Sequence, residues 1–156
     1  MTPLAWRPDY ELGVRRMDDT HREFVALLGA LGQAPDGAFL AALDQLIEHT
    51  VEHFAQENRW MERTEFGPLC HIAEHHHVLN VARQVREKVS EGDVALGRKL
   101  ASELAVWFEH HASTMDTMLA SHMARVGFDP DADDAALVAS AEAAAVAPAA
   151  QAGTPA

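Results

Sequence analysis

Apolar residues recur every three or four positions along four segments of this chain, which predicts four amphipathic α-helices. The segments run over residues 18–31, 38–64, 68–89 and 94–125, and none alternates with the period of two that strands require. Short turns containing Gly, Pro or Asp separate them. Because short links join long helices, we expect an all-α fold, an up-down-up-down antiparallel four-helix bundle.

The two ends of the chain differ from these segments. Residues 1–17 are interrupted by prolines and a glycine and should form an N-terminal arm, with Asp18 among the residues that cap the first helix. Residues 128–156 are acidic and rich in alanine, with few large apolar side chains to bury. We therefore predict a bundle domain over residues 1–127 and a C-terminal tail, 128–156, that is weakly helical, loosely attached or disordered.

Composition and charge exclude several kinds of partner. The 156 residues carry a formal net charge of −12 without a basic cluster, so we expect neither nucleic acid nor an anionic membrane as a partner. No apolar run is long enough to span a bilayer, and the first residues lack the pattern of a secretion signal. The single cysteine, Cys70, fits a reducing cytoplasm, and we expect it to be buried as a small apolar side chain.

Side chains with metal-binding atoms interrupt the apolar faces of all four helices. Residues four apart share a helix face, so His53 pairs with Glu57 and His71 with His75. Burying an imidazole or carboxylate without a partner costs several kcal/mol, which a bound cation would offset. The candidate metal ligands are His21, His53, Glu57, His71, His75, His111 and Asp116.

The donor types narrow the kind of site. Imidazole and carboxylate suit iron, manganese, zinc or copper, and this many ligands exceed what one zinc ion takes. Two metal ions fit this number of ligands better than one, with three histidines on one ion, two on the other, and the carboxylates bridging the two ions. With a bridging hydroxide, this set favours the reduced metal and leaves one octahedral position open, which suits one small diatomic ligand.

One spacing does not fit an ideal helix. His111 and Asp116 are five residues apart, an offset of roughly 140° on a helix of about 3.6 residues per turn. We expect either that Asp116 reaches sideways across the interior or that the helix is locally loosened there.

At these residues the chain resembles the hemerythrin family, and within it the single-domain bacterial hemerythrins. The matching motifs lie in the family's order over residues 6–120: Trp6 with Gly13-Val14; Asp18-Asp19-Thr20-His21; His53-Phe54-Ala55-Gln56-Glu57 with Met61; His71-x3-His75; and Trp107-x3-His111-x4-Asp116. The five-residue step to Asp116 recurs in the family pattern, so the irregular spacing supports the resemblance.

The resemblance implies reversible O2 binding at two non-haem iron ions with an oxo/hydroxo bridge. By that likeness, His71, His75 and His111 hold one iron, His21 and His53 hold the other, and Glu57 and Asp116 bridge them. Apolar neighbours, namely Phe24, Leu28, Phe54 and Trp107, would keep water out. O2 is then the expected ligand, and an unidentified protein is expected to receive it.

Several residues near the motifs are expected to stay outside the site. Asn58 follows Glu57 where many bacterial members carry a second acid, and we expect it to lie off the ligand face with little effect. Met115 and Met118 should fill the core. The remaining histidines are assigned lesser roles: His49 beside the ligands, His122 as a cap near the bundle end, and His76, His77 and His110 in solvent.

Three functions compete at this point. The first is a carrier, store or sensor of O2 that is not an enzyme. The second is a di-iron enzyme handling peroxide, nitric oxide or ferrous iron, for which no substrate pocket or free general base is obvious. The third is a bundle whose histidines bind zinc or serve only structure, and metal content would distinguish it from the other two.

Overall fold

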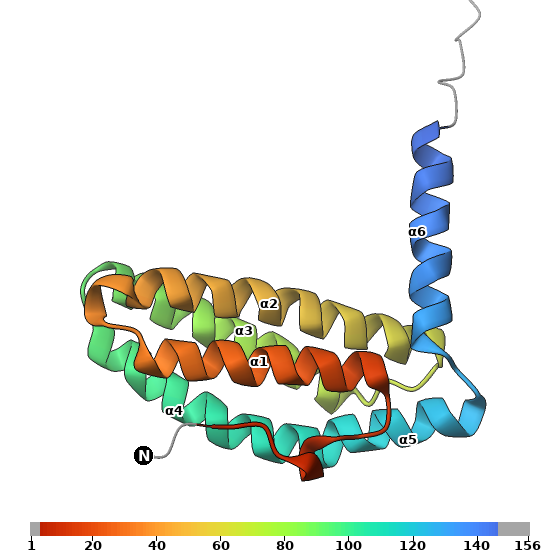
Figure 1. Ribbon diagram of the computed structural model, residues 1–156, viewed down its shortest axis with the longest axis horizontal. Coiled ribbons are helices and arrows are strands. Elements are labelled where there is room, and N and C mark those ends of the chain that lie inside the picture. The colour runs from red at the N-terminus through yellow and green to blue at the C-terminus, as the bar shows by residue number, and fades with distance from the viewer. Residues whose placement is uncertain (1–3, 147–156) are drawn as a thin grey trace, which may run out of the picture.

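The computed structural model describes residues 4–146, and every regular element in that range is helical. The elements in chain order are a short 3-10 helix, Pro8–Tyr10, then α1 (Arg15–Gln33), α2 (Asp36–Arg63), α3 (Leu69–Ser90), α4 (Val94–His111), a π-helix (Ala112–Asp116), α5 (Thr117–Val126) and α6 (Pro130–Val146). Consecutive helices pack side by side, α1 also packs on α4, and α5 extends the rod of α4 (Figure 1). The predicted antiparallel four-helix bundle is confirmed.

The inward faces carry the apolar stripes that the sequence predicted. Phe24 and Leu31 on α1 and Phe39 and Leu43 on α2 have no measurable solvent exposure. They belong to a core that extends through all four rods, and a smaller cluster around Trp60 closes the end of the bundle near α5. Burial of such side chains contributes roughly 1.5–3 kcal/mol each, which is the main stabilisation of a bundle of this size.

The first helix begins earlier than the sequence suggested. It starts at Arg15, so Asp18 lies inside it and is not its cap. The Asp18 carboxylate instead accepts hydrogen bonds from the backbone N–H groups of Leu12, at 2.7 Å, and Gly13, at 3.2 Å. Gly13 adopts a left-handed conformation, with φ of +82°, which glycine tolerates without strain. Asp18 therefore fastens the N-terminal arm to the bundle.

The last rod of the bundle is interrupted where the irregular spacing occurs. Between α4 and α5 the chain forms a π-helix over Ala112–Asp116, and the Thr117 hydroxyl donates to the Ala112 carbonyl oxygen five residues back, at 2.8 Å. A π-helix is wider than an α-helix, so residues five apart come onto one face. Of the two explanations that the sequence left open, local loosening of the helix is the one observed.

The predicted weak helix of the tail is present as α6, which projects from the end of the bundle (Figure 1). Pro130 is its only buried residue, and ion pairs tie its first turns to α1 and α2. The remaining tail, residues 147–156, lies outside the described part of the chain. No described helix is long and apolar enough to cross a membrane.

Two predictions about burial are wrong. Cys70 is exposed because it lies on the outer face of α3, the same face as the exposed His77, whereas the next residue, His71, points inward and is buried. Met118 is 56% exposed because the π-helix rotates the residues after it, while Met115 is partly buried. Met61, by contrast, is fully packed in the smaller cluster.

Candidate metal centre

All seven predicted ligands come together at the centre of the bundle. His21 lies on α1, His53 and Glu57 on α2, His71 and His75 on α3, His111 at the end of α4, and Asp116 at the end of the π-helix. Their exposed fractions lie between 0% and 3%. Their donor atoms form two overlapping sets in which every pair lies within 4.8 Å: Glu57 with His71, His75, His111 and Asp116, and Glu57 with His21 and His53.

Glu57 has one oxygen on each side of the centre. Its Oε1 lies 2.8 Å from Nε2 of His53 and 3.3 Å from Nε2 of His21. Its Oε2 faces the other histidines, 3.2 Å from Nε2 of His75 and 3.6 Å from Nε2 of His71. A carboxylate divided in this way between two groups of imidazoles has the arrangement of a bridging ligand.

Asp116 repeats this division from the opposite rod. Its Oδ2 lies 3.2 Å from Nε2 of His21. Its Oδ1 lies 3.1 Å from Nε2 of both His71 and His111. The π-helix makes this possible, because it brings Asp116 to the same interior face as His111. The centre thus contains three imidazoles on one side, two on the other, and two carboxylates between them.

Several of these buried atoms lack a directed hydrogen bond within residues 4–146. They are Nε2 of His71, Oε2 of Glu57 and both carboxylate oxygens of Asp116. Buried polar groups are nearly always bonded to a partner, so a group of inward-facing donor atoms without directed hydrogen bonds is typical of residues that bind a cation. Nitrogen and oxygen donors without thiolate suit non-haem iron among the metals expected here, and the residues present fit it.

The charges of the cluster are strongly coupled. Burial would raise the pKa of Glu57, but the adjacent His53, His21 and His71 outweigh it and hold that pKa well below its usual range. For Asp116, burial and the nearby Glu57 both raise the pKa, yet contacts with His111, His21 and His71 lower it overall. Both carboxylates are therefore ionised, as metal ligands must be.

The histidines respond to these anions unequally. Burial alone would lower the pKa of His21, but Asp116 and Glu57 raise it to about 10. The same balance raises the pKa of His71 to about 9. The pKa of His75 is lowered, chiefly by burial. Without metal, protons on some imidazoles therefore neutralise the carboxylates, and a metal must displace those protons to bind.

Two contacts to the outward ring nitrogens were not predicted. Nδ1 of His75 lies 2.8 Å from Oδ1 of Asn58, so Asn58 contacts a candidate ligand directly, although the sequence predicted a position apart from the site. Nδ1 of His111 lies 3.1 Å from Oε1 of Glu74, and that oxygen also accepts a 2.6 Å hydrogen bond from the Trp107 indole N–H. No periodic signal marked Glu74, because it faces the neighbouring helix at the edge of the interior.

Aromatic rings surround the centre. Phe54 stacks on His75 with ring centroids 4.0 Å apart, and Trp107 stacks on His111 at 4.5 Å. Phe108 meets His21 edge to face at 5.3 Å and packs against Phe24. The predicted neighbours Phe24, Phe54 and Leu28 are buried, and Trp107 is partly buried. Rings in direct contact with the imidazoles exclude water from the cluster.

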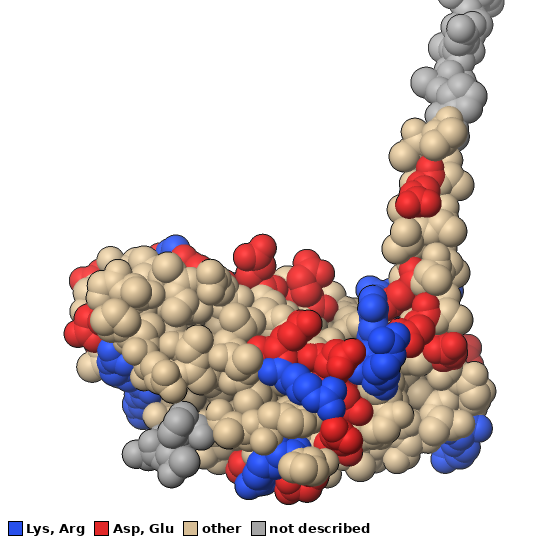
Figure 2. All heavy atoms as spheres, in the orientation of Figure 1, with Lys and Arg blue, Asp and Glu red and all other residues tan. Residues whose placement is uncertain are grey.

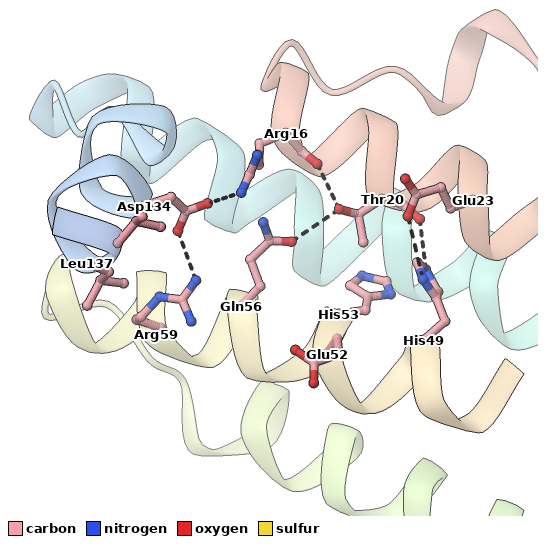
Figure 3. Close-up of a pocket in the computed structure, with 11 residues that line it drawn as sticks. Arg16, Thr20, Glu23, His49, Glu52, His53, Gln56, Arg59, Asp134 and Leu137 are labelled. Atoms are coloured by element: carbon pink, nitrogen blue, oxygen red, sulfur yellow. Dashed lines mark hydrogen bonds and ion pairs between the residues drawn. The ribbon is translucent and has the colours of Figure 1, made fainter. Parts of the chain in front are cut away.

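A pocket of about 420 Å³ lies beside the two-histidine side of the centre. His53 lines it, together with Thr20 and Gln56, which are joined by a 3.1 Å hydrogen bond (Figure 3). Leu137 and Asp134 of α6 form part of its wall. The sequence did not predict this pocket, because residues of α6 form part of its wall and the attachment of α6 to the bundle is not evident from the sequence.

The other histidines lie largely where expected. His49 is next to His53 in the same pocket, and its Nε2 lies 3.2 Å from the carbonyl oxygen of Thr20. His122 stacks on Phe66 at the bundle end, with Nε2 3.1 Å from the carbonyl oxygen of Thr64. His76, His77 and His110 are exposed. None of these five joins the central cluster.

Comparison with known proteins agrees with this geometry. The chain matches the family model of the hemerythrin HHE cation-binding domain over residues 12–122. It is 43% identical over 137 residues to a bacteriohemerythrin of Ralstonia nicotianae, covering 87% of this chain and 98% of that protein. It is 25% identical to a bacteriohemerythrin of Pseudomonas aeruginosa (74% and 78% covered) and 24% identical to the myohemerythrin of Sipunculus nudus (73% and 88% covered).

No solved structure matched the chain. The family match nevertheless covers most of the bundle, and it includes every helix that contributes to the central cluster. The family match and the cluster of histidines and carboxylates support a non-haem iron-binding domain, and the chain belongs to the hemerythrin family.

Proposed function

We propose that this chain binds O2 reversibly at a di-iron centre with an oxo/hydroxo bridge, and that it is not primarily an enzyme. In this proposal His71, His75 and His111 hold one iron, His21 and His53 hold the other, and Glu57 and Asp116 bridge them. The observation that carries the proposal is the division of both carboxylates, each with one oxygen toward the three-histidine side and one toward the two-histidine side.

The difference between the two sides indicates where O2 would bind. Fewer protein ligands on the His21 and His53 side leave a position for a small ligand there. His53 also lines the pocket beside α6, which would give a small ligand a route from solvent to this side. When bound, the iron pair supplies the electrons for O2 binding, while Phe54 and Phe108 exclude water from the imidazoles around it.

The relatives are named bacteriohemerythrin and myohemerythrin, which supports the family membership from which this proposal starts. A cytoplasmic location and an unidentified protein recipient of oxygen are part of the same proposal. A di-iron enzyme acting on peroxide, nitric oxide or ferrous iron is the competing function. It would show turnover in place of a stable oxygenated form.

The test is anaerobic loading with ferrous iron, followed by air and then argon, with absorbance recorded at each stage. Reversible O2 binding predicts a charge-transfer band that appears in air and disappears under argon over repeated cycles. The matched control is the same protein loaded with zinc, which has no redox chemistry and should show no band. A band that never forms, or that is lost after one cycle with net substrate consumption, would refute the proposal.

A further inference from the structure

The outward nitrogens of two neighbouring imidazoles have acceptors of different charge. In His75 and His111 the Nε2 atoms face the carboxylates of the centre, 3.2 Å from Glu57 and 3.1 Å from Asp116. Their Nδ1 atoms face outward, to the Asn58 side-chain oxygen at 2.8 Å and to the Glu74 carboxylate at 3.1 Å. With Nε2 turned inward to the metal position, Nδ1 carries the proton and donates in both cases.

Glu74 is fixed as an anion in this role. Its carboxylate accepts from the indole N–H of Trp107 at 2.6 Å as well as from His111. Two N–H donors directed at one carboxylate oxygen, on a side chain that is 25% exposed to solvent, favour the ionised form of Glu74. An ionised acceptor draws the proton of the imidazole toward itself, which makes the ring a stronger electron donor to a metal.

Asn58 makes the same contact without charge. It follows Glu57 on α2, so the helix that presents a bridging carboxylate also presents the acceptor for His75. An amide oxygen orients the ring as a carboxylate would, but it adds no negative charge beside the metal. By contrast, Nδ1 of His21 and of His53 has no hydrogen-bond partner within residues 4–146. The polarising contacts to Nδ1 are thus concentrated on the three-histidine side.

We propose that Asn58 and Glu74 are positioning residues that tune the reduction potential of the metal centre in opposite senses. Glu74 strengthens His111 as a donor and stabilises the oxidised metal. Asn58 orients His75 as Glu74 orients His111, but its amide adds no second negative charge outside the centre. The ferrous state therefore stays accessible and autoxidation is slowed. The redox part of this inference rests on the proposed function, and the part that concerns donor strength does not.

The surroundings of Asn58 allow the contact to be changed cleanly. Asn58 lines a pocket of about 460 Å³ together with Met61, Glu62 and Gly67. Asn58→Asp alters one atom type and adds a charge at a position next to solvent-filled space. Glu74→Gln makes the reverse change at the other imidazole. Neither substitution alters side-chain volume, so the bundle should fold with both.

The experiment compares these two variants and their combination. With iron bound, Asn58→Asp should speed autoxidation by about three- to tenfold, and Glu74→Gln should slow it by a similar factor. In the double variant one outer carboxylate remains, so its rate should return to within about threefold of the original chain. Glu62→Gln is the matched control, because Glu62 lines the same pocket as Asn58 but contacts no candidate ligand. It should change the autoxidation rate less than about twofold, as expected of a surface substitution.

A second readout needs no oxygen chemistry. The affinity of the metal-free protein for Co²⁺ should rise about tenfold with Asn58→Asp and fall about tenfold with Glu74→Gln. A merely structural role predicts that both substitutions weaken Co²⁺ binding, because both disturb an established contact. Changes of the same sign, or no change in either variant, would overturn the inference. If the iron-loaded protein shows no reversible O2 band, the proposed function fails, and the opposed Co²⁺ affinities still test this inference.

Discussion

Charged side chains gather in two regions of this molecule, and the two regions differ in what neutralises their charges. At the centre of the bundle, seven ionisable residues are almost wholly buried, and all seven are histidines or carboxylates, with no lysine or arginine among them to neutralise the anions. At the junction of α6 with the bundle, arginines and aspartates already pair with one another near solvent (Figure 2). We call the second region the α6 junction, and it consists of Arg15, Arg16, Arg59 and Arg63 with Asp131, Asp133 and Asp134.

The difference shows how burial decides the role of a charge. Buried carboxylates without a lysine or arginine partner need another source of positive charge, so the central cluster depends on bound metal or on protons. The α6 junction needs none, because arginines already neutralise its aspartates, and ion pairs in which one partner reaches solvent typically contribute only about 0–1 kcal/mol each. Substitutions at the centre should therefore abolish a function, while substitutions at the α6 junction should loosen an attachment.

The largest effect is expected from His75→Ala. This change removes a proposed ligand and the ring on which Phe54 stacks, so bound iron should fall below two per chain and the oxygenated spectrum should disappear. Iron content and absorbance measure both outcomes. His77→Ala, on the same helix but exposed, is the control and should retain full iron. Full iron and normal O2 binding in His75→Ala would refute the ligand assignment.

Metal loading should release protons. His21 and His71 have pKa values of about 10 and about 9 in the metal-free protein, so both carry a proton at neutral pH and must lose it to bind metal. Raising the pH toward these values should strengthen metal binding, and lowering it should weaken binding. The measurement is the pH change of a weakly buffered solution on addition of Zn²⁺. Binding without proton release would contradict the charge balance described for the centre.

Deletion of residues 130–156 should leave the metal centre intact. α6 contributes none of the seven central residues, and Pro130 is its only buried residue in the described range. We expect full iron content and a loss of about 1–2 kcal/mol in the free energy of unfolding, from the lost ion pairs. Denaturant unfolding and iron analysis measure these quantities. A collapse in iron content would show that α6 supports the centre.

Asp134→Asn should have the smallest effect. Asp134 lies 2.7 Å from Arg16 and 2.9 Å from Arg59, and the substitution weakens both pairs (Figure 3). We expect a loss of about 0.5–1 kcal/mol in unfolding free energy and faster amide exchange in α6, with high salt having the same effect on the original chain. Glu142→Gln, farther along α6 at an exposed position, is the control. Equal exchange in Asp134→Asn and the original chain would mean that these pairs do not hold α6.

The sequence predicted the bundle and the central cluster because both depend on periodicity within single helices. His53 and Glu57 share a face of α2 regardless of how the neighbouring helices are placed, and the stripe of buried apolar residues on α2 continues directly into these two. Asp116 required a departure from the ideal helix, and its spacing left two explanations open, a sideways reach of the side chain or a local loosening of the helix. The π-helix is the second of these. Spacing therefore predicted that an irregularity exists but not its form.

The missed features are contacts between elements. Asn58 and Glu74 reach imidazoles on other helices, and periodicity says nothing of how far a neighbouring helix is rotated. Asp18 was expected to cap a helix because its carboxylate suits free backbone N–H groups, but it binds those of the N-terminal arm. The exposure of Cys70 depends on how α3 is rotated against its neighbours, with His71 inward and Cys70 outward, which the identity of Cys70 as a small apolar residue does not determine.

Anomalous X-ray diffraction at the iron absorption edge, from crystals of the iron-loaded protein, tests the central claim most directly. Convergence of the seven residues predicts two peaks inside the bundle, one next to His71, His75 and His111, the other next to His21 and His53, with Glu57 and Asp116 between them. A single peak, or a second peak remote from His21 and Asp116, would contradict the di-iron centre.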